Sequence, residues 1–145
     1  MAQHLLRIGH AALSYLGADG LPGISRIAHG HDGEGVSLTL ISALAPHVAG
    51  LAANPDCALM LGEPGGRGDP LTHPRLMIRA QAVLAPGVDR ATLREIWLNQ
   101  HPKAKLYVDF SDFAFVRLRP VSGILNAGFG KAFVLAPENL RIDVE

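Results

Sequence analysis

The residues best suited to hold a charged or planar ligand lie in two short segments, the first of which runs from Leu40 to His47. There an apolar strand pattern leads into a helix that begins with proline. A helix N-terminus can hold a phosphate because its free N–H groups and its dipole favour an anion. The Ser42 hydroxyl and the His47 ring could add two donors. The same spacing also suits a Ser42 that caps a turn and a His47 that faces solvent.

The second segment is Gly128-Phe129-Gly130-Lys131. Glycine on each side of Phe129 permits positive φ or close approach of the backbone to another group. Phe129 could then lie against a planar ring, and Lys131 could meet a negative charge. A β-bulge at the rim of a barrel, with Lys131 in solvent, explains the same residues equally well.

The histidines give a weaker signal for a metal site. His29 and His31 are two residues apart, which on a strand places them on one face. A zinc site needs three or four ligands, and no third ligand stands at a diagnostic spacing. We therefore predict no metal site and interpret the pair as a strand end that enters the turn at Asp32-Gly33.

No conventional catalytic residue is predicted either. Cys57 opens an apolar strand pattern, as a small buried hydrophobic residue would, and the serines lack a Gly-x-Ser-x-Gly motif. Asp109 and Asp112 could form a pair of carboxylates, but their spacing better suits the capping of a turn or helix.

The elements that must position these residues are mostly strands. Asp-Gly-type turns separate three opening strands, which predicts an antiparallel meander. These strands are residues 11–16, 22–29 and 36–41. Later elements alternate less regularly: a helix at 46–53, strands at 56–61 and 76–84, a helix at 89–99, and a strand pair at 113–118 and 122–127. Pro120 separates that pair, and residues 131–135 close the sheet.

This order lacks regular helical crossovers, so it favours a mainly β fold, an antiparallel barrel with helices packed outside. With 145 residues and a hydrophobic fraction of 48%, residues 1–145 are predicted to form a single domain. Thirteen basic residues balance thirteen acidic ones, which argues against nucleic-acid and membrane-surface partners. A single cysteine and the lack of a signal-peptide pattern indicate a cytoplasmic location.

Several ordered motifs together resemble the pyridoxamine 5'-phosphate oxidase-like, FMN-binding split-barrel superfamily, most of all its branch of HugZ/HutZ-type haem-utilisation and CREG-like proteins. The motifs are Ser42-Ala-Leu44-Ala-x-His47 with Asn54-Pro55, Asp69-Pro-Leu71-x-His73-Pro-Arg75, His101-Pro-x-Ala104 with Asp112-Phe113, and Asn126-Ala-Gly128-Phe129-Gly130-Lys131. The similarity covers nearly the whole chain.

The resemblance implies a six-stranded antiparallel split barrel that works as a homodimer, with FMN in two symmetric grooves at the dimer interface. By position, Ser25, Arg26 and Ile27 would lie on the strand that passes the flavin ring. Ser42, Leu44 and His47 would lie at the ribityl-phosphate end. The late residues Asn126, Gly128, Phe129 and Lys131 would approach the groove or the substrate side.

The chain departs from that family pattern directly after His47. Related sequences carry a Thr-Arg-Asn-like run there, whereas this chain has Val48-Ala49-Gly50, without a side-chain donor or charge. Loss of a charge-assisted contact typically removes about 1.5 to 3 kcal/mol. Haem-degrading relatives also carry a ligating histidine in a C-terminal extension, and no histidine follows His101 here, so haem degradation through such a ligand is not expected.

Three hypotheses follow. The first is an FMN-binding oxidoreductase that acts on an unidentified small molecule, in which the flavin carries the redox chemistry and Arg26 or Lys131 stabilises its charge. The second is a haem-binding protein with His47 or His73 as the ligand. The third is a dimeric split barrel that has lost its cofactor and serves as an interaction module, which the departure at Val48-Ala49-Gly50 favours.

Overall fold

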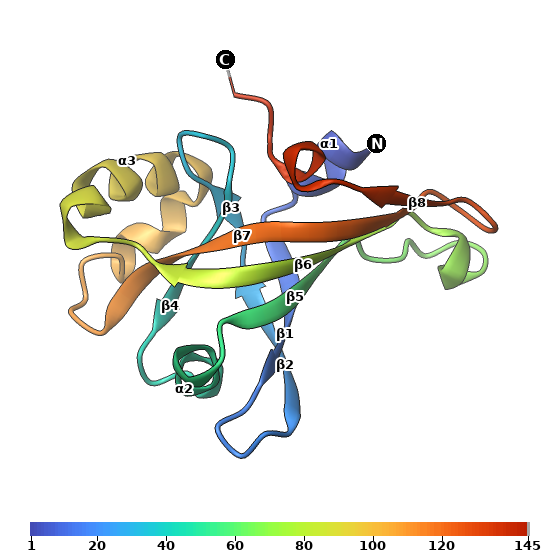
Figure 1. The fold of residues 1–145 in the computed structure, drawn as a ribbon. Helices are drawn as coiled ribbons and strands as arrows, with labels where there is room; N and C mark the ends of the chain where they lie inside the picture. The colour runs from blue at the N-terminus through green and yellow to red at the C-terminus, as the bar shows by residue number, and fades with distance from the viewer. Residues whose placement is uncertain (145) are drawn as a thin grey trace.

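One curled antiparallel sheet organises the chain in the computed structural model, which describes residues 1–144 (Figure 1). Its strands follow the order β2-β1-β5-β6-β7-β4-β3, and β8 pairs with β7. The strands are β1 (His10–Leu16), β2 (Pro22–Ala28), β3 (Gly30–His31), β4 (Ser37–Ser42), β5 (Asp56–Leu61), β6 (Arg75–Leu84), β7 (Phe113–Asn126) and β8 (Ala132–Leu135). The predicted mainly β split barrel is confirmed. Within the described residues the sheet has eight strands; β8 corresponds to the strand predicted at 131–135, and short β3 was not predicted as a separate strand.

Three α-helices and four short 3-10 helices lie at the ends and edges of the sheet. They are α1 (Ala2–Leu6), α2 (Pro46–Ala53), α3 (Arg90–Gln100), η1 (Pro70–Thr72), η2 (Gly87–Asp89), η3 (Pro102–Leu106) and η4 (Pro137–Leu140). Pro46 supplies the fixed φ that suits the first turn of α2, and Pro55 follows its C-cap Asn54. Within the described residues, no helix is long and apolar enough to cross a membrane.

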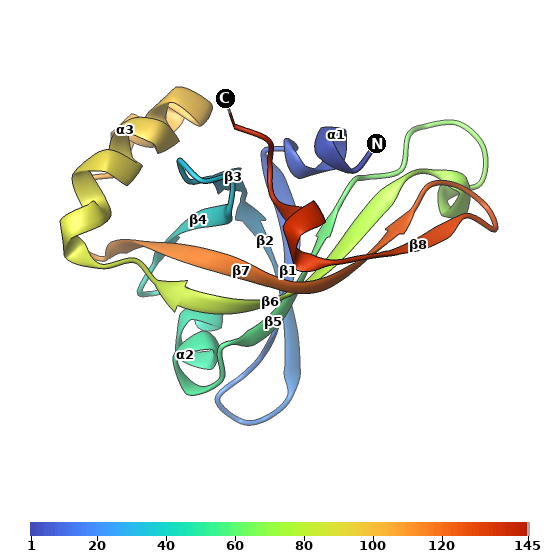
Figure 2. The same ribbon diagram turned by 45° about the horizontal axis from the view of Figure 1, so that its top comes forward.

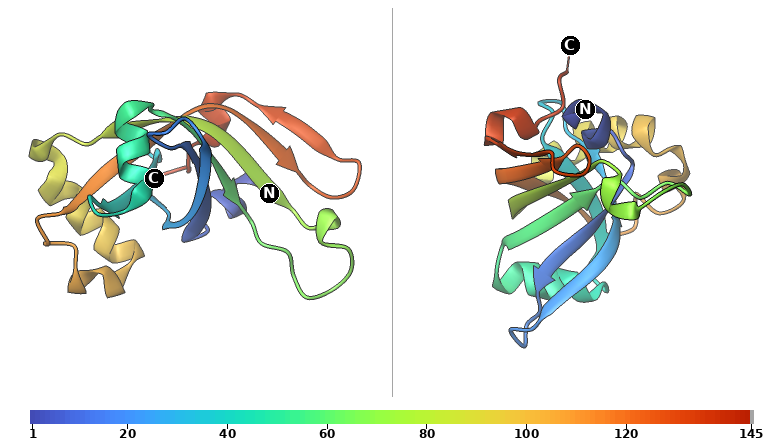
Figure 3. Two further views of the ribbon diagram at one scale, coloured as in Figure 1. Left: turned by 90° about the horizontal axis from the view of Figure 1, so that it is seen from below. Right: turned by 90° about the vertical axis from the view of Figure 1, so that its right-hand side faces the viewer.

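The inner face of the curled sheet holds the main core. Alternate residues along β1, β5 and β6, such as Leu13, Leu59 and Ile78, point inward and are almost fully buried. The curl brings α1 and the C-terminal segment over this face, where Leu140 and Ile142 complete the core (Figure 3). Burial of side chains of this size stabilises the fold by about 1.5 to 3 kcal/mol each.

The late strand pair predicted at 113–118 and 122–127 is one continuous strand, β7, which is 14 residues long. Pro120 lies inside it, at the point where the β6–β7 register shifts between Arg79 and Ala80. A bulge leaves one residue of the longer strand unpaired, so proline is tolerated there without losing a ladder hydrogen bond. The prediction of strand structure on both sides of Pro120 is therefore confirmed, but the predicted break at Pro120 is wrong.

The predicted opening meander is confirmed only in part. β1 pairs with β2, and β3 pairs with β4 across the predicted turn, at Gly30↔Leu38 and His31↔Ser37. The predicted third strand does not pair with β2, however: β4 pairs with β7 from Leu38↔Arg117 to Ser42↔Phe113, and β3 lies at the opposite end of the strand order from β2. Five of the six residues of β4 are buried, because this strand is packed on both faces.

Helix α3 covers the outer face of the sheet at its β4–β7 end (Figure 1). Trp97 and Leu93 of α3 pack against Leu38, Leu40 and Phe115 in a second apolar cluster. This cluster leaves the outer face of β1, β5 and the first half of β6 without a covering helix.

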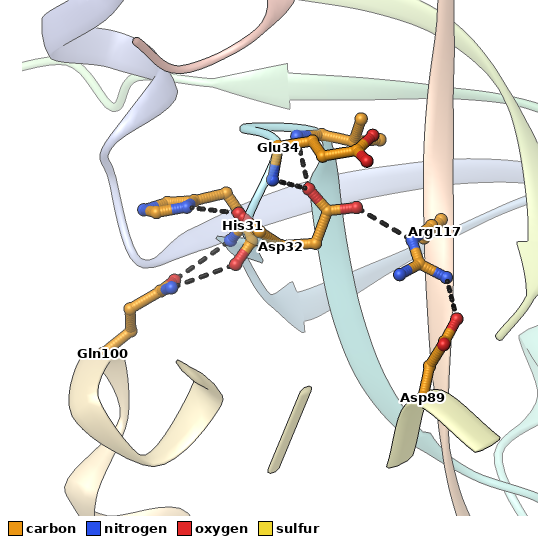
Figure 4. A network of polar contacts seen from close by, with 7 residues as sticks. His31, Asp32, Glu34, Asp89, Gln100 and Arg117 are labelled. Atoms are coloured by element: carbon orange, nitrogen blue, oxygen red, sulfur yellow. Dashed lines mark hydrogen bonds and ion pairs between the residues drawn. The ribbon is translucent and has the colours of Figure 1, made fainter. Parts of the chain in front are cut away.

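An ion-pair network ties α3 and the β3–β4 turn to β7 (Figure 4). The Arg117 guanidinium donates to Asp32 at 2.8 Å and to Asp89 at 3.2 Å. The Asp32 carboxylate is almost fully buried and also accepts the backbone N–H groups of Glu34 and Val36. Gln100 at the end of α3 exchanges two hydrogen bonds with the backbone of His31.

Removal of Arg117 should destabilise the protein. In Arg117→Ala the buried Asp32 carboxylate keeps two backbone donors but loses its counter-charge, and such a change typically costs about 3 kcal/mol. Urea denaturation followed by tryptophan fluorescence measures the loss. Arg119→Ala, which removes an exposed arginine two residues along β7, should leave the midpoint nearly unchanged. Equal midpoints for the two variants would contradict the role of the network.

His29 makes the stability of the fold depend on pH. Its Nδ1 donates to the Ile8 carbonyl and its Nε2 lies 2.9 Å from the Ser37 hydroxyl, which donates to it in the neutral form. Burial lowers the pKa of His29 from 6.5 to about 4. The unfolded chain therefore takes up a proton before the folded chain does, and stability falls as pH falls between those values.

We expect a loss of about 3 kcal/mol in unfolding free energy from this residue between pH 7 and pH 4. Urea titrations across that range should show a much flatter profile for His29→Gln than for the unaltered protein. His4→Gln, a substitution at an exposed histidine of α1, provides the control. A profile of His29→Gln as steep as that of His4→Gln would show that His29 is not the responsible group.

Candidate functional site

A groove lies between the end of β2, the end of β4 and the start of α2, with a volume of about 250 Å³. We call it the β2–β4 groove. Apolar and aromatic side chains form most of its wall, with one cationic group, two hydroxyl groups and one imidazole among them. The lining residues are Arg26, Ile27, Ala28, Leu40, Ile41, Ser42, His47, Tyr107 and Phe113. A mostly apolar cavity with a few polar groups is the usual composition of a site for a small molecule or cofactor.

Two of the predicted site segments meet in this groove. Arg26 and Ile27 from β2 face Ser42 and His47 from the β4–α2 connection. Ser25 is the neighbour of Arg26 on β2 but does not line the groove, and Leu44 is 86% exposed in the turn before α2.

The third predicted segment lies elsewhere in the same chain. Residues 127–131 form the turn of the β7–β8 hairpin, closed by a hydrogen bond from the Ala127 N–H to the Lys131 carbonyl. Gly128 and Gly130 both have positive φ, as the turn requires, and Phe129 is 81% exposed. The hairpin points away from α2 in Figure 1 and Figure 2. Asn126 ends β7 beside it, opposite Arg75 and Ala132.

A carboxylate, that of Asp112, lies beside the Ser42 end of the groove. The Ser42 hydroxyl donates to the Asp112 carboxylate at 2.8 Å and accepts the Leu44 N–H at 3.2 Å. The Ala43 N–H donates to the Asp112 carbonyl at 2.7 Å. Ser42 therefore caps the turn that leads into α2, one of the two roles that its sequence position allowed.

His47 is buried, so the interpretation in which it faces solvent is wrong. Its side chain packs against the Tyr15 ring with centroids 5.9 Å apart, and burial lowers its pKa. Within the described residues neither ring nitrogen has a hydrogen-bond partner, although both are shielded from water. Most buried polar groups in native proteins are paired, so the two unpaired nitrogens of His47 make it a candidate to contact a ligand.

The run Val48-Ala49-Gly50 serves packing rather than ligand binding. Val48 packs against the main core, and Gly50 is buried against β1. A Cβ on Gly50 would overlap the Leu16 carbonyl oxygen and press on the Tyr15 ring. The first turns of α2 thus approach the sheet too closely to present a long polar side chain at position 50.

Tyr107 and Phe113 form an aromatic wall of the groove, with ring centroids 5.0 Å apart. Helix α3 fixes this wall, because Arg90 donates to the carbonyls of Val108 and Phe113 at 2.8 Å each. The sequence analysis did not assign these two rings to the site. The sequence signal that could have indicated them is the presence of two aromatic residues, one on each side of Asp112, in a segment rich in turn residues.

The remaining reactive side chains are engaged in structural contacts. His73, an alternative haem ligand, accepts the Gly65 N–H at Nδ1 and lies 2.6 Å from the Arg67 carbonyl at Nε2. Asp109 pairs with Arg94, which lowers the pKa of Asp109, instead of forming a carboxylate pair with Asp112. Burial raises the pKa of the Cys57 thiol to about 11, so it stays protonated at neutral pH. In residues 1–144 no cluster of three or more potential ligands is placed to hold a metal ion.

Comparison with known proteins identified similar sequences and folds, although no family model matches the chain. The chloroplastic haem oxygenase HOZ of Arabidopsis thaliana is 36% identical over 118 residues, which are 77% of this chain and 35% of that protein. One solved chain of nearly equal length is 42% identical and superposes with a TM-score of 0.87 over 98% of this chain and 93% of its own.

A haem-binding protein from Mycobacterium smegmatis superposes with a TM-score of 0.84 at 26% identity, over 97% of this chain and 60% of its own. The chain thus spans about a third of the plant protein and three fifths of the mycobacterial one.

More distant structures share the fold alone. The haem storage protein HutZ of Vibrio cholerae superposes with a TM-score of 0.68 at 21% identity, over 89% of both chains. A protein of the pyridoxinephosphate oxidase family from Clostridium acetobutylicum does so with the same TM-score at 16% identity, over 95% of this chain and 98% of its own. Together with the motifs and the curled antiparallel sheet, these similarities show that the chain belongs to the pyridoxamine 5'-phosphate oxidase-like split-barrel superfamily, among whose members are haem-binding and haem-utilisation proteins.

Proposed function

We propose that this protein binds haem in the β2–β4 groove and takes part in haem handling. The observation that carries the proposal is the unpaired imidazole of His47, which lines the groove. A neutral imidazole is the commonest metal ligand in proteins and a frequent axial ligand of haem iron. Because burial lowers the pKa of His47, the ring stays neutral and retains the lone pair that an iron atom needs.

The other walls of the groove suit the same ligand. Ile27, Leu40 and Ile41 offer apolar surface to a porphyrin face, and Tyr107 offers an aromatic one. Arg26 can meet a propionate. Both nitrogens of His47 are shielded in the ligand-free chain, so ligation requires the ring to turn toward the groove. Bound haem would supply an iron centre able to bind oxygen; the protein residues supply the pocket, the ligand and the charge.

Similar proteins support this choice of ligand. A relative that matches 77% of the chain is named as a haem oxygenase, and a solved relative at 26% identity is named as a haem-binding protein. Since the chain spans only part of both, oxidative haem cleavage is a separate proposal from haem binding. A dedicated catalytic residue is not assigned.

FMN is the second candidate ligand, and the meeting of Arg26 and Ile27 with Ser42 and His47 in one groove favours it. Those are the segments that the family resemblance places along the flavin ring and at the phosphate. In that case the protein would be an oxidoreductase acting on a small molecule, with the flavin carrying the electrons.

The outer face of the sheet offers a surface to which a second copy of the chain could bind in a homodimer. On the outer face of the sheet, Ala12, Met60, Met77, Ile124 and Val134 are directly paired neighbours across five strands. Met60 is 47% exposed and Val134 is 83% exposed. An apolar row across a sheet face that no helix covers is typical of a protein–protein contact. In a dimer, the hairpin residues Gly128, Phe129 and Lys131 could reach the partner's groove.

Haem binding is tested by titration into the purified full chain. We expect a Soret band that shifts and saturates near one haem per chain, and loss of that shift together with at least a tenfold weaker affinity in His47→Ala. His73→Ala is the matched control, because both ring nitrogens of His73 are already engaged in its loop. An unshifted Soret band in the unaltered protein, or identical titrations for His47→Ala, would contradict the proposal. The spectrum before titration distinguishes flavin, haem and an empty site.

The dimer is tested at Met60. Met60→Glu places a charge in the centre of the apolar row, where a second copy would have to bury it, so it should convert a dimer into a monomer in multi-angle light scattering. Val88→Glu, a substitution at a residue that is 90% exposed in η2, should leave the mass unchanged. A monomeric unaltered protein, or a dimer that survives Met60→Glu, would exclude this surface as the interface.

A further inference from the structure

We propose that Asp112 determines the ligand specificity of the β2–β4 groove, by excluding molecules that would place a phosphate at its Ser42 end. This rests on the proposed function of the groove as a ligand site. It adds that the ligand carries no phosphate at this end. It also explains why a barrel of this superfamily would favour a ligand other than FMN.

Asp112 is fixed at this end by two contacts of different kinds. Its carboxylate accepts the Ser42 hydroxyl hydrogen at 2.8 Å, and its backbone carbonyl accepts the Ala43 N–H at 2.7 Å. Both partners belong to the turn through which β4 enters α2. Ser42 lines the groove itself, so the carboxylate lies one hydrogen bond away from any ligand that contacts Ser42.

Apart from the His47 ring, whose two nitrogens are unpaired within residues 1–144, the side-chain donors at this end are already used or missing. The Ser42 hydroxyl hydrogen is directed at Asp112, and the Leu44 N–H is directed at the Ser42 oxygen. Pro46 has no N–H at the first position of α2, and the Val48 N–H donates to the Ala45 carbonyl. The side chains of Ala49 and Gly50 provide no charge or donor.

A phosphate would also meet a like charge there. A phosphate monoester carries close to two negative charges at neutral pH. Repulsion from a carboxylate at about 6 Å near a protein surface is strong enough to weaken binding by about tenfold or more.

Arg26 adds the opposite charge to the lining of the groove. Its side chain is 80% exposed and lies 3.7 Å from Glu63. A haem propionate would be attracted by Arg26 and repelled by Asp112, whereas FMN in the orientation that the family resemblance implies would direct its phosphate at Asp112.

Riboflavin and FMN test this directly, because they differ only in the phosphate. The dissociation constants of both are measured by flavin fluorescence with the full-length protein. We expect the unaltered protein to bind riboflavin more tightly than FMN, and Asp112→Asn to strengthen FMN binding about tenfold with little change for riboflavin. The asparagine oxygen can still accept the Ser42 hydrogen, so the thermal unfolding midpoint should be nearly unchanged. Asp109→Asn removes an exposed carboxylate three residues away and should alter neither constant.

Any of three results overturns the proposal. The first is that the unaltered protein binds FMN more tightly than riboflavin. The second is that Asp112→Asn gains no FMN affinity, which includes the case in which this variant binds no FMN at all. The third result is an equal gain in FMN affinity in Asp109→Asn. These outcomes are independent of the haem titration with His47→Ala. A failed haem titration with a clear Asp112→Asn effect would replace haem with an unphosphorylated flavin as the ligand. If haem binds but Asp112→Asn gains no FMN affinity, the groove is a haem site whose ligand specificity does not depend on Asp112.

Discussion

The pairing of β7 with three other strands is the constraint on which the rest of the structure depends. This one strand pairs with β4 at its start, with β6 along most of its length and with β8 at its end. The register shift opposite Arg79 and Ala80 accommodates Pro120 without loss of these partners. The two apolar clusters lie on opposite faces of β7, because successive side chains of a strand alternate: Phe115 faces the cluster under α3, and Val116 and Leu118 face the main core.

The start of β7 also brings the candidate site together. β4 reaches the groove because it is paired to the first residues of β7, and Phe113 enters the wall from that first residue. Helix α3 then fixes the wall through Arg90, while Arg117 of β7 fixes α3 through Asp32 and Asp89. The side chains that line the groove and the ion pairs that stabilise the fold are thus connected through α3. The ion pairs lie on one side of this contact network and the groove lies on the other.

Local sequence signals were sufficient for elements bounded by strong chemistry. Pro46 and Asn54-Pro55 set the limits of α2, and the apolar run of β5 was placed at its observed bounds. Pairing was harder, since nothing in residues 37–42 indicates that their partners lie more than 70 residues later. The proline inside β7 was read as a break because a bulge depends on the opposite strand. In the site, residue types indicated Arg26, Ser42 and His47, whereas the burial of His47 and the position of Asp112 depend on tertiary contacts. The residues of the β7–β8 hairpin are exposed in the single chain, so they could contact a groove only in a second copy. A contact between two copies depends on how they assemble, which the sequence of one chain does not specify.

The close approach of Gly50 to β1 has an evolutionary consequence. Because a side chain at this position would overlap the Leu16 carbonyl, no substitution at position 50 can add a polar group unless α2 moves away from β1. Such a movement would expose Val48 and Leu51 and lower stability before any affinity was gained. Ala49 is exposed and free of this constraint, so a polar contact from α2 would evolve more readily at position 49 than at position 50.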